Sequence, residues 1–146
     1  MTENVLVTIK GLQFDAADEN LIEQINIGRL SEINNKIYVK YDEILDGEND
    51  LTSNLIKISE DSVEITKRGA VSAHMQFCAN EKTTSLYKTP FGSLQLGILA
   101  RNVDIDKKKE EINILIEYSI EVNDEQISEN KIQICIRQQE KAENLI

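Results

Sequence analysis

The chain has 146 residues, enough for one domain with a full hydrophobic core. Its 26 Asp and Glu residues against 16 Lys and Arg give a net charge of −10, which disfavours binding to nucleic-acid phosphates and anionic membranes. No apolar run approaches the ~20 residues of a transmembrane helix, and the N-terminal residues carry no basic run before an apolar stretch. The only two cysteines, Cys78 and Cys135, are far apart, so we expect free thiols and a cytoplasmic location.

Apolar residues alternate with other residues along short segments from one end of the chain to the other. This period of two is typical of β-strands with one buried face, and the many isoleucines suit a pleated sheet. The apolar positions that we expect on the inner face are, in chain order, Val5, Val7, Ile9, Ile25, Ile27, Ile37, Val39, Tyr41, Ile56, Ile58, Val63, Ile65, Ala73, Met75, Phe77, Leu94, Leu96, Ile98, Ile112, Ile114, Ile116, Tyr118, Ile120, Val122, Ile132, Ile134 and Ile136.

Short turn-forming segments separate these strands. Asn34 and Asn35 can supply the positive φ angles of a tight hairpin, and further breaks fall at 46–50, 89–90 and 123–125. The intervals leave no room for helical crossovers, so the strands must be antiparallel and must follow an up-and-down order. Eight to ten strands, several of them long, favour one closed all-β barrel over residues 1–146.

Few residues in this chain could carry out chemistry. A single histidine, His74, excludes a metal site with several histidines, and alternation places it on the outer face, although a ligand or acid/base role stays open. The cysteines form no CxxC pair, which argues against zinc. Residues 46–50 (Asp-Gly-Glu-Asn-Asp) loosely suggest calcium but lack the ligand spacing of an EF-hand, so a solvated turn is expected. We therefore expect no cofactor, no metal and no enzyme activity.

The segment 87–92 (Tyr-Lys-Thr-Pro-Phe-Gly) contains the only proline of the chain. One interpretation is structural: Pro90 fixes φ at a corner while Tyr87 and Phe91 plug one end of the barrel. The other interpretation is a ligand-binding mouth.

Cations could complete such a mouth. Arg68, in the run Lys-Arg-Gly at 67–69, or Arg101 would neutralise an anionic head group. The candidate ligand-binding residues are therefore Arg68, Tyr87, Phe91 and Arg101.

These motifs also carry a resemblance. The run Lys-Arg-Gly at 67–69, Phe77, the pattern Tyr-x-Thr-Pro-Phe-Gly-x-Leu-x-Leu at 87–96 and the Ile-x-Ile-x-Ile-x-Tyr strand at 112–118 resemble the YwiB-like family of small bacterial proteins. The resemblance implies a calycin-like (lipocalin-like) β-barrel in the bacterial cytoplasm. The family is described as a domain of unknown function, so no catalytic residues carry over. The chain departs from the family pattern at Gln76 and Ala100.

Three functions are compatible with such a barrel. We expect a non-catalytic protein that binds a small apolar or amphipathic molecule in or at the mouth of the barrel. The alternative is a filled barrel that serves as a protein-interaction or homodimerisation module. Its footprint would be the outward apolar residues Leu6, Tyr38, Leu55, Leu99 and Leu115. An enzyme that uses His74 or Tyr87 at the mouth is the third.

Overall fold

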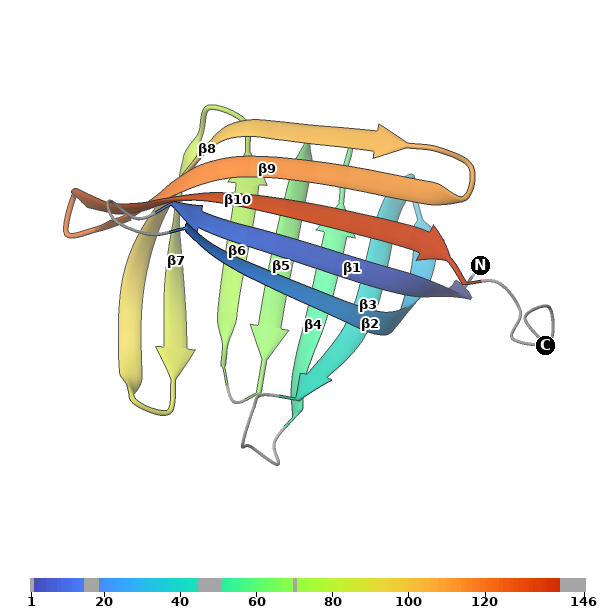
Figure 1. The fold of residues 1–146 in the computed structure, drawn as a ribbon, viewed down its shortest axis with the longest axis horizontal. Coiled ribbons are helices and arrows are strands. Elements are labelled where there is room, and N and C mark those ends of the chain that lie inside the picture. The colour runs from blue at the N-terminus through green and yellow to red at the C-terminus, as the bar shows by residue number, and fades with distance from the viewer. Residues whose placement is uncertain (1, 15–18, 45–50, 70, 140–146) are drawn as a thin grey trace.

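The computed structural model describes residues 2–14, 19–44, 51–69 and 71–139. These residues form strands and turns (Figure 1). The strands are β1 (Thr2–Phe14), β2 (Glu19–Ile33), β3 (Lys36–Ile44), β4 (Leu51–Ile58), β5 (Ser62–Arg68), β6 (Ala73–Cys78), β7 (Lys82–Thr89), β8 (Gly92–Lys107), β9 (Glu111–Val122) and β10 (Glu125–Gln138). No helix among the described residues is long and apolar enough to cross a membrane.

The ten strands form one antiparallel sheet in which nearly every strand pairs with its neighbour in the sequence. β1 also pairs with β10, so the sheet curls around until β6 and β7 face each other (Figure 1). The predicted up-and-down antiparallel barrel of eight to ten strands is therefore confirmed. The tight turn at Asn34 and Asn35 is also present, with φ angles of 53° and 66°.

The barrel is nearly closed, and its seam lies between β6 and β7. One backbone bridge joins them, with hydrogen bonds of 2.9 and 2.8 Å between Ser72 and Lys88. The hydroxyl of Thr83 also donates to the carbonyl of Gln76 at 2.9 Å. The seam therefore separates two strands that are consecutive in the chain, whereas the first and last strands are fully paired.

Most of the expected inner positions do form the core. Its buried hydrophobic members are Val5, Val7, Ile37, Val39, Tyr41, Ile56, Ile58, Val63, Ile65, Phe77, Ile98, Ala100, Ile112, Ile114, Ile116, Ile134 and Ile136. The β-branched side chains stand roughly perpendicular to the sheet and fill the barrel from all sides.

The prediction for β2 was wrong. Ile25 and Ile27 lie on the outer surface, 61% and 65% exposed. The register explains this, because Val7 of the core lies opposite Asn26, and residues directly opposite share a face of the sheet. Gly28 also faces inward, where an added Cβ would lie 2.9 Å from the carbonyl oxygen of Lys40. The close approach of β2 to β3 thus requires glycine and sets which face of β2 is buried.

Candidate functional site

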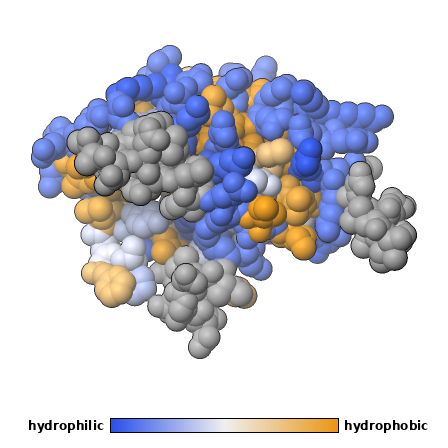
Figure 2. Space-filling model, viewed as in Figure 1, coloured by the Kyte–Doolittle hydropathy of each residue, from blue (hydrophilic) through white to orange (hydrophobic). Residues whose placement is uncertain are grey.

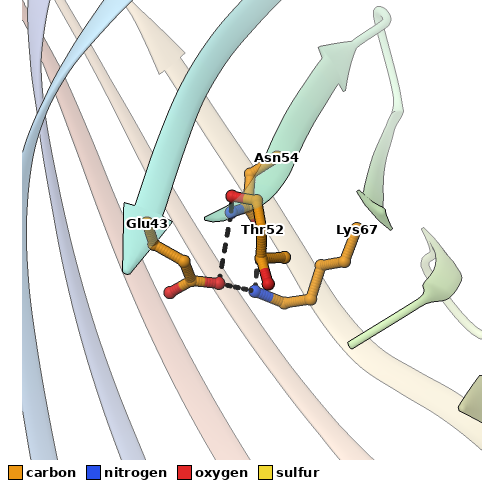
Figure 3. Close-up of polar contacts among 4 residues, drawn as sticks. All are labelled: Glu43, Thr52, Asn54 and Lys67. Atoms are coloured by element: carbon orange, nitrogen blue, oxygen red, sulfur yellow. Dashed lines mark hydrogen bonds and ion pairs between the residues drawn. The ribbon is translucent and has the colours of Figure 1, made fainter. Parts of the chain in front are cut away.

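At one end of the barrel the inner face becomes polar. Glu43 at the end of β3 lies opposite Thr52 at the start of β4, and Asn54 lies opposite Lys67 near the end of β5. The side chains of Glu43, Asn54 and Lys67 meet, and Thr52 joins them through its backbone carbonyl, as Figure 3 shows. We call these residues, Glu43, Thr52, Asn54 and Lys67, the polar cluster.

A lysine and a glutamate form the centre of the polar cluster. The Lys67 ammonium donates to Glu43 Oε1 and to Asn54 Oδ1, both at 2.8 Å. Asn54 Nδ2 in turn donates to Glu43 Oε1 at 3.1 Å and to the Thr52 carbonyl at 3.3 Å (Figure 3). The geometry is that of a charge-assisted pair held in place by an amide side chain.

Both partners of this pair are largely withdrawn from solvent. The side chains of Lys67 and Glu43 are 20% and 10% exposed. Burial by itself raises the pKa of Glu43, but the hydrogen bond and charge of Lys67, with hydrogen bonds from Asn54 and Gln24, outweigh it and leave the pKa below its ordinary value. Glu43 is therefore ionised at neutral pH, and the pair is balanced in charge.

Three tyrosines lie close to this pair. Burial and then the charge of Glu43 raise the pKa of both Tyr41 and Tyr87. Burial, with a smaller effect of Tyr87, raises the pKa of Tyr118 to about 12. The Tyr118 ring also meets Phe77 edge-on, with ring centroids 5.0 Å apart. All three phenols are therefore neutral hydrogen-bonding groups.

Two buried hydroxyls of the barrel interior have no partner. Thr52 is 0% and Ser85 3% exposed, and neither Oγ atom has a hydrogen-bond partner within the described part of the chain. Buried polar atoms are nearly always hydrogen-bonded, so each exception calls for an explanation such as water or a ligand. Thr52 takes part in the polar cluster through its carbonyl oxygen, and its Oγ1 makes none of the hydrogen bonds described there.

Next to the polar cluster the barrel holds a cavity of about 270 Å³. This volume is just below the range of roughly 300–1,000 Å³ that is typical of small-molecule pockets. Its apolar wall consists of Ile9, Ile65, Met75, Ile132 and Ile134, and its inward polar residues are Gln24, Tyr41, Glu43, Lys67, Tyr118 and Asn130. The cavity is therefore amphipathic, with the ion pair on its polar side.

Of the four residues predicted to bind a ligand, only Tyr87 approaches the polar cluster. Arg68 is exposed on the outside of β5, opposite Ser53. Arg101 sits at a bulge of β8 and forms an ion pair with Glu129 at 2.7 Å, where both side chains are about half exposed. The structure does not bring these residues together.

Phe91 lies at the tip of the β7–β8 turn and is 100% exposed. The expectation that it would plug one end of the barrel was therefore wrong. Its backbone N–H donates to the hydroxyl of Thr89 at 3.1 Å, so the turn is held by local hydrogen bonds rather than by packing of the ring.

The remaining candidates for chemistry lie on the outside. His74 faces solvent as predicted, with Nδ1 3.0 Å from the hydroxyl of Thr66 and Nε2 3.8 Å from Glu64. Cys78 and Cys135 are free, and burial followed by nearby carboxylates raises the pKa of both thiols. In the described ranges, no group of three or more His, Cys, Asp or Glu side chains could hold a metal ion. The acidic segment 46–50 lies outside those ranges.

Charged groups also gather elsewhere on the described residues, as at the hollow lined by Lys82, Glu121 and Asp124. On the described part of the face in Figure 2, hydrophilic areas surround separate hydrophobic ones. A wider hollow of about 530 Å³ lies on the outside of β1, β10, β9 and β8, between side chains such as Leu6, Leu115 and Arg137. It is about as open to solvent as the cavity beside the polar cluster, but its lining is less apolar.

Sequence reasoning missed the polar cluster, although a signal was present. Glu43 continues the inward phase of Ile37, Val39 and Tyr41, and Lys67 continues that of Val63 and Ile65. A charged residue in phase with an apolar inner face is a buried charge, which is rare without a partner. Such residues are better indicators of an interior site than cations next to turns.

Comparison with known proteins places this barrel in a family. A Bacillus subtilis (strain 168) protein described as "Uncharacterized beta-barrel protein YwiB" is 30% identical over 124 residues, which are 84% of this chain and 84% of that protein. The crystal structure of the ywiB protein from Bacillus subtilis shares the fold, with a TM-score of 0.84, 24% identity, and coverage of 95% of this chain and 94% of that one. The resemblance inferred from the sequence is thus confirmed. A family model described as "Domain of unknown function (DUF1934)" matches residues 7–134, and the chain belongs to that family.

Proposed function

We propose that this protein is a non-catalytic binding protein that holds a small amphipathic molecule inside its barrel. The observation that carries the proposal is the interior cavity of about 270 Å³, which has an apolar wall on one side and the Glu43–Lys67 pair on the other. A ligand with an apolar body and a polar head would match both sides.

The cost of the ion pair supports a binding role over a purely structural one. Taking two charges out of water costs several kcal/mol per ion, and replacing a buried pair by apolar residues is often neutral or stabilising. The opposite end of the barrel shows that this chain can fill its interior with isoleucine, valine and phenylalanine. Apolar side chains in place of Glu43, Asn54 and Lys67 would therefore be expected to give at least the same stability.

Native mass spectrometry of freshly purified protein tests the proposal. We expect an excess mass under native conditions that disappears on denaturation, and a rise in melting temperature when short-chain amphiphiles are added. A protein that carries no excess mass and is not stabilised by any amphiphile would contradict a binding role.

A pair of variants on one strand locates the ligand. Met75→Trp directs a large ring into the cavity, whereas His74→Trp places the same ring on the outer face of β6. We expect Met75→Trp to weaken amphiphile binding at least about tenfold (~1.4 kcal/mol) and His74→Trp to leave it unchanged. Equal binding by both variants would show that the ligand lies elsewhere.

A second candidate function is self-association through the outer face. The register places Ile27 beside Leu6, and Ile25 and Ile27 are 61% and 65% exposed. Sedimentation over a range of concentrations should then show a dimer that Ile27→Lys abolishes and that Arg29→Lys, on the same face, leaves intact. A monomer at every concentration would contradict this candidate.

A further inference from the structure

We propose that the ligand's head group is uncharged and both donates and accepts hydrogen bonds, as a hydroxyl or a primary amide does. This inference rests on the proposed function and specifies its ligand. It follows from the charge balance of the cavity and from the hydrogen-bonding groups that its polar side leaves unused.

The charge balance comes first. Among the described residues that line the cavity and face inward, the ionisable groups that carry charge are Glu43 and Lys67. Lys131 also borders the cavity, but it lies opposite Glu117 in the outward phase of β10. The two inward charges are 2.8 Å apart and neutralise each other. An added carboxylate or ammonium would leave one net charge beside a pair whose side chains are only 20% and 10% exposed, which is unfavourable.

The unused hydrogen-bonding groups come second. An ammonium group has three donors, and Lys67 uses two of them on Glu43 and Asn54, so one is free. The amide side chain of Asn130 also lines the cavity and can both donate and accept. Tyr41 and Tyr118 add phenol groups to the lining of the cavity. This mixed set fits a head group that offers one donor and one acceptor.

The size of the cavity limits the apolar body. About 270 Å³, lined by Ile9, Ile65, Met75, Ile132 and Ile134, accommodates a short hydrocarbon chain or a single ring rather than a long lipid tail. These five side chains offer no strong hydrogen-bonding groups, so they favour an apolar body but do not specify its shape.

Four ligands with the same octyl chain test the inference: octan-1-ol, octanamide, octanoate and octylammonium. Binding to the wild-type protein is measured by titration calorimetry at neutral pH. We expect the alcohol and the amide to bind at least about tenfold more tightly than either charged ligand. Binding of all four within threefold, or tightest binding of a charged ligand, would overturn the inference and leave the proposed function standing. Failure of every octyl ligand to bind would overturn both.

Variants of the ion pair provide a second test, because each is expected to change which ligand binds most tightly. Glu43→Gln leaves the positive charge of Lys67 alone, so octanoate should become the preferred ligand. Lys67→Gln leaves a negative charge, so octylammonium should gain. The double variant Glu43→Gln/Lys67→Gln is again neutral and should restore the wild-type order. A preference that does not follow the charge of the site would contradict the inference. Circular dichroism establishes whether each variant is folded. If a variant is not folded, the four ligands measured on the wild-type protein decide the inference without it.

Discussion

The two ends of the barrel are built from the same strands but differ in chemistry. At one end, consecutive cross-strand partners from β3 to β6 are Ile37, Ile58, Val63 and Phe77, all with 4% exposure or less. At the other end, the corresponding row is Tyr41, Asn54, Lys67 and Ala73. The first row belongs entirely to the buried hydrophobic core. In the second row, Tyr41 and Lys67 line the cavity, so the comparison contrasts an apolar row with a row that contains half of an ion pair.

The largest expected effect comes from the packed end. Phe77 is 0% exposed and contacts Tyr118 edge-on, so Phe77→Ala should lower the free energy of unfolding by about 3–5 kcal/mol through lost burial and a residual cavity. Urea denaturation measures this change. Phe91→Ala is the matched control, because that ring is 100% exposed and its removal should change stability by no more than about 0.5 kcal/mol. Equal effects of the two substitutions would contradict the assignment of the core.

Breaking the ion pair should have the next largest effect. Lys67→Met leaves the Glu43 carboxylate without its cation and should destabilise the protein by about 2–4 kcal/mol, below the value for a fully buried pair because Lys67 is 20% exposed. Lys40→Met, on the exposed outer face of β3, is the control. The double variant Lys67→Met/Glu43→Leu should recover much of the loss. If the double variant is as unstable as the single one, the pair contributes stability of its own and the contrast between the two ends is weaker.

The pH dependence of stability should reveal the same pair. The pKa of Glu43 in the folded protein lies below its ordinary value near 4.5, so the stabilisation from the ionised carboxylate is complete above that pH. It is lost as the pH falls through the lower pKa of the folded state. The free energy of unfolding of the wild type should therefore fall more steeply below pH 4.5 than that of Glu43→Gln. Parallel curves would show that Glu43 does not titrate differently in the folded and unfolded states.

The smallest effect distinguishes an unpartnered hydroxyl from a partnered one. Thr52→Val removes a buried oxygen without a described partner and should be neutral or stabilising by up to about 1 kcal/mol. Thr83→Val removes the 2.9 Å hydrogen bond to the Gln76 carbonyl at the seam and should cost about 0.5–1.5 kcal/mol. Thermal unfolding of both variants measures the difference. A clear loss of stability in Thr52→Val would mean that its hydroxyl is already satisfied.

The fold could be predicted from the sequence because its signal is local and repeated. Alternation at Ile112, Ile114 and Ile116, or at Ile37 and Val39, is visible within a few residues. The same reasoning failed at β2, where the alternation of Ile25 and Ile27 predicted an inner face but both side chains are exposed. Their true orientation depends on which residues of β1 and β3 lie opposite, and that register is a property of the whole sheet.

The candidate site was less predictable than the fold. Tyr87 was identified because it stands in an unusual segment, and the structure brings it near Glu43. Arg68 and Arg101 were chosen as cations near turns, yet both point outward. The hydrogen bond between Lys67 and Glu43 joins residues 24 positions apart in the sequence, and no local sequence pattern predicts such a contact.

The sequence by itself determined that this protein is a single antiparallel barrel, because a period of two with short turns leaves few other ways to bury so many isoleucines. Only the tertiary structure decided that the seam of the barrel lies between β6 and β7 and which face of β2 is buried. It also decided that Glu43 and Lys67 form an ion pair beside a cavity at one end. These features arise when strands distant in the chain take a common register around a closed surface. Which side chains contact one another then depends on how the strands lie in space. The alternation along a single strand does not encode that arrangement.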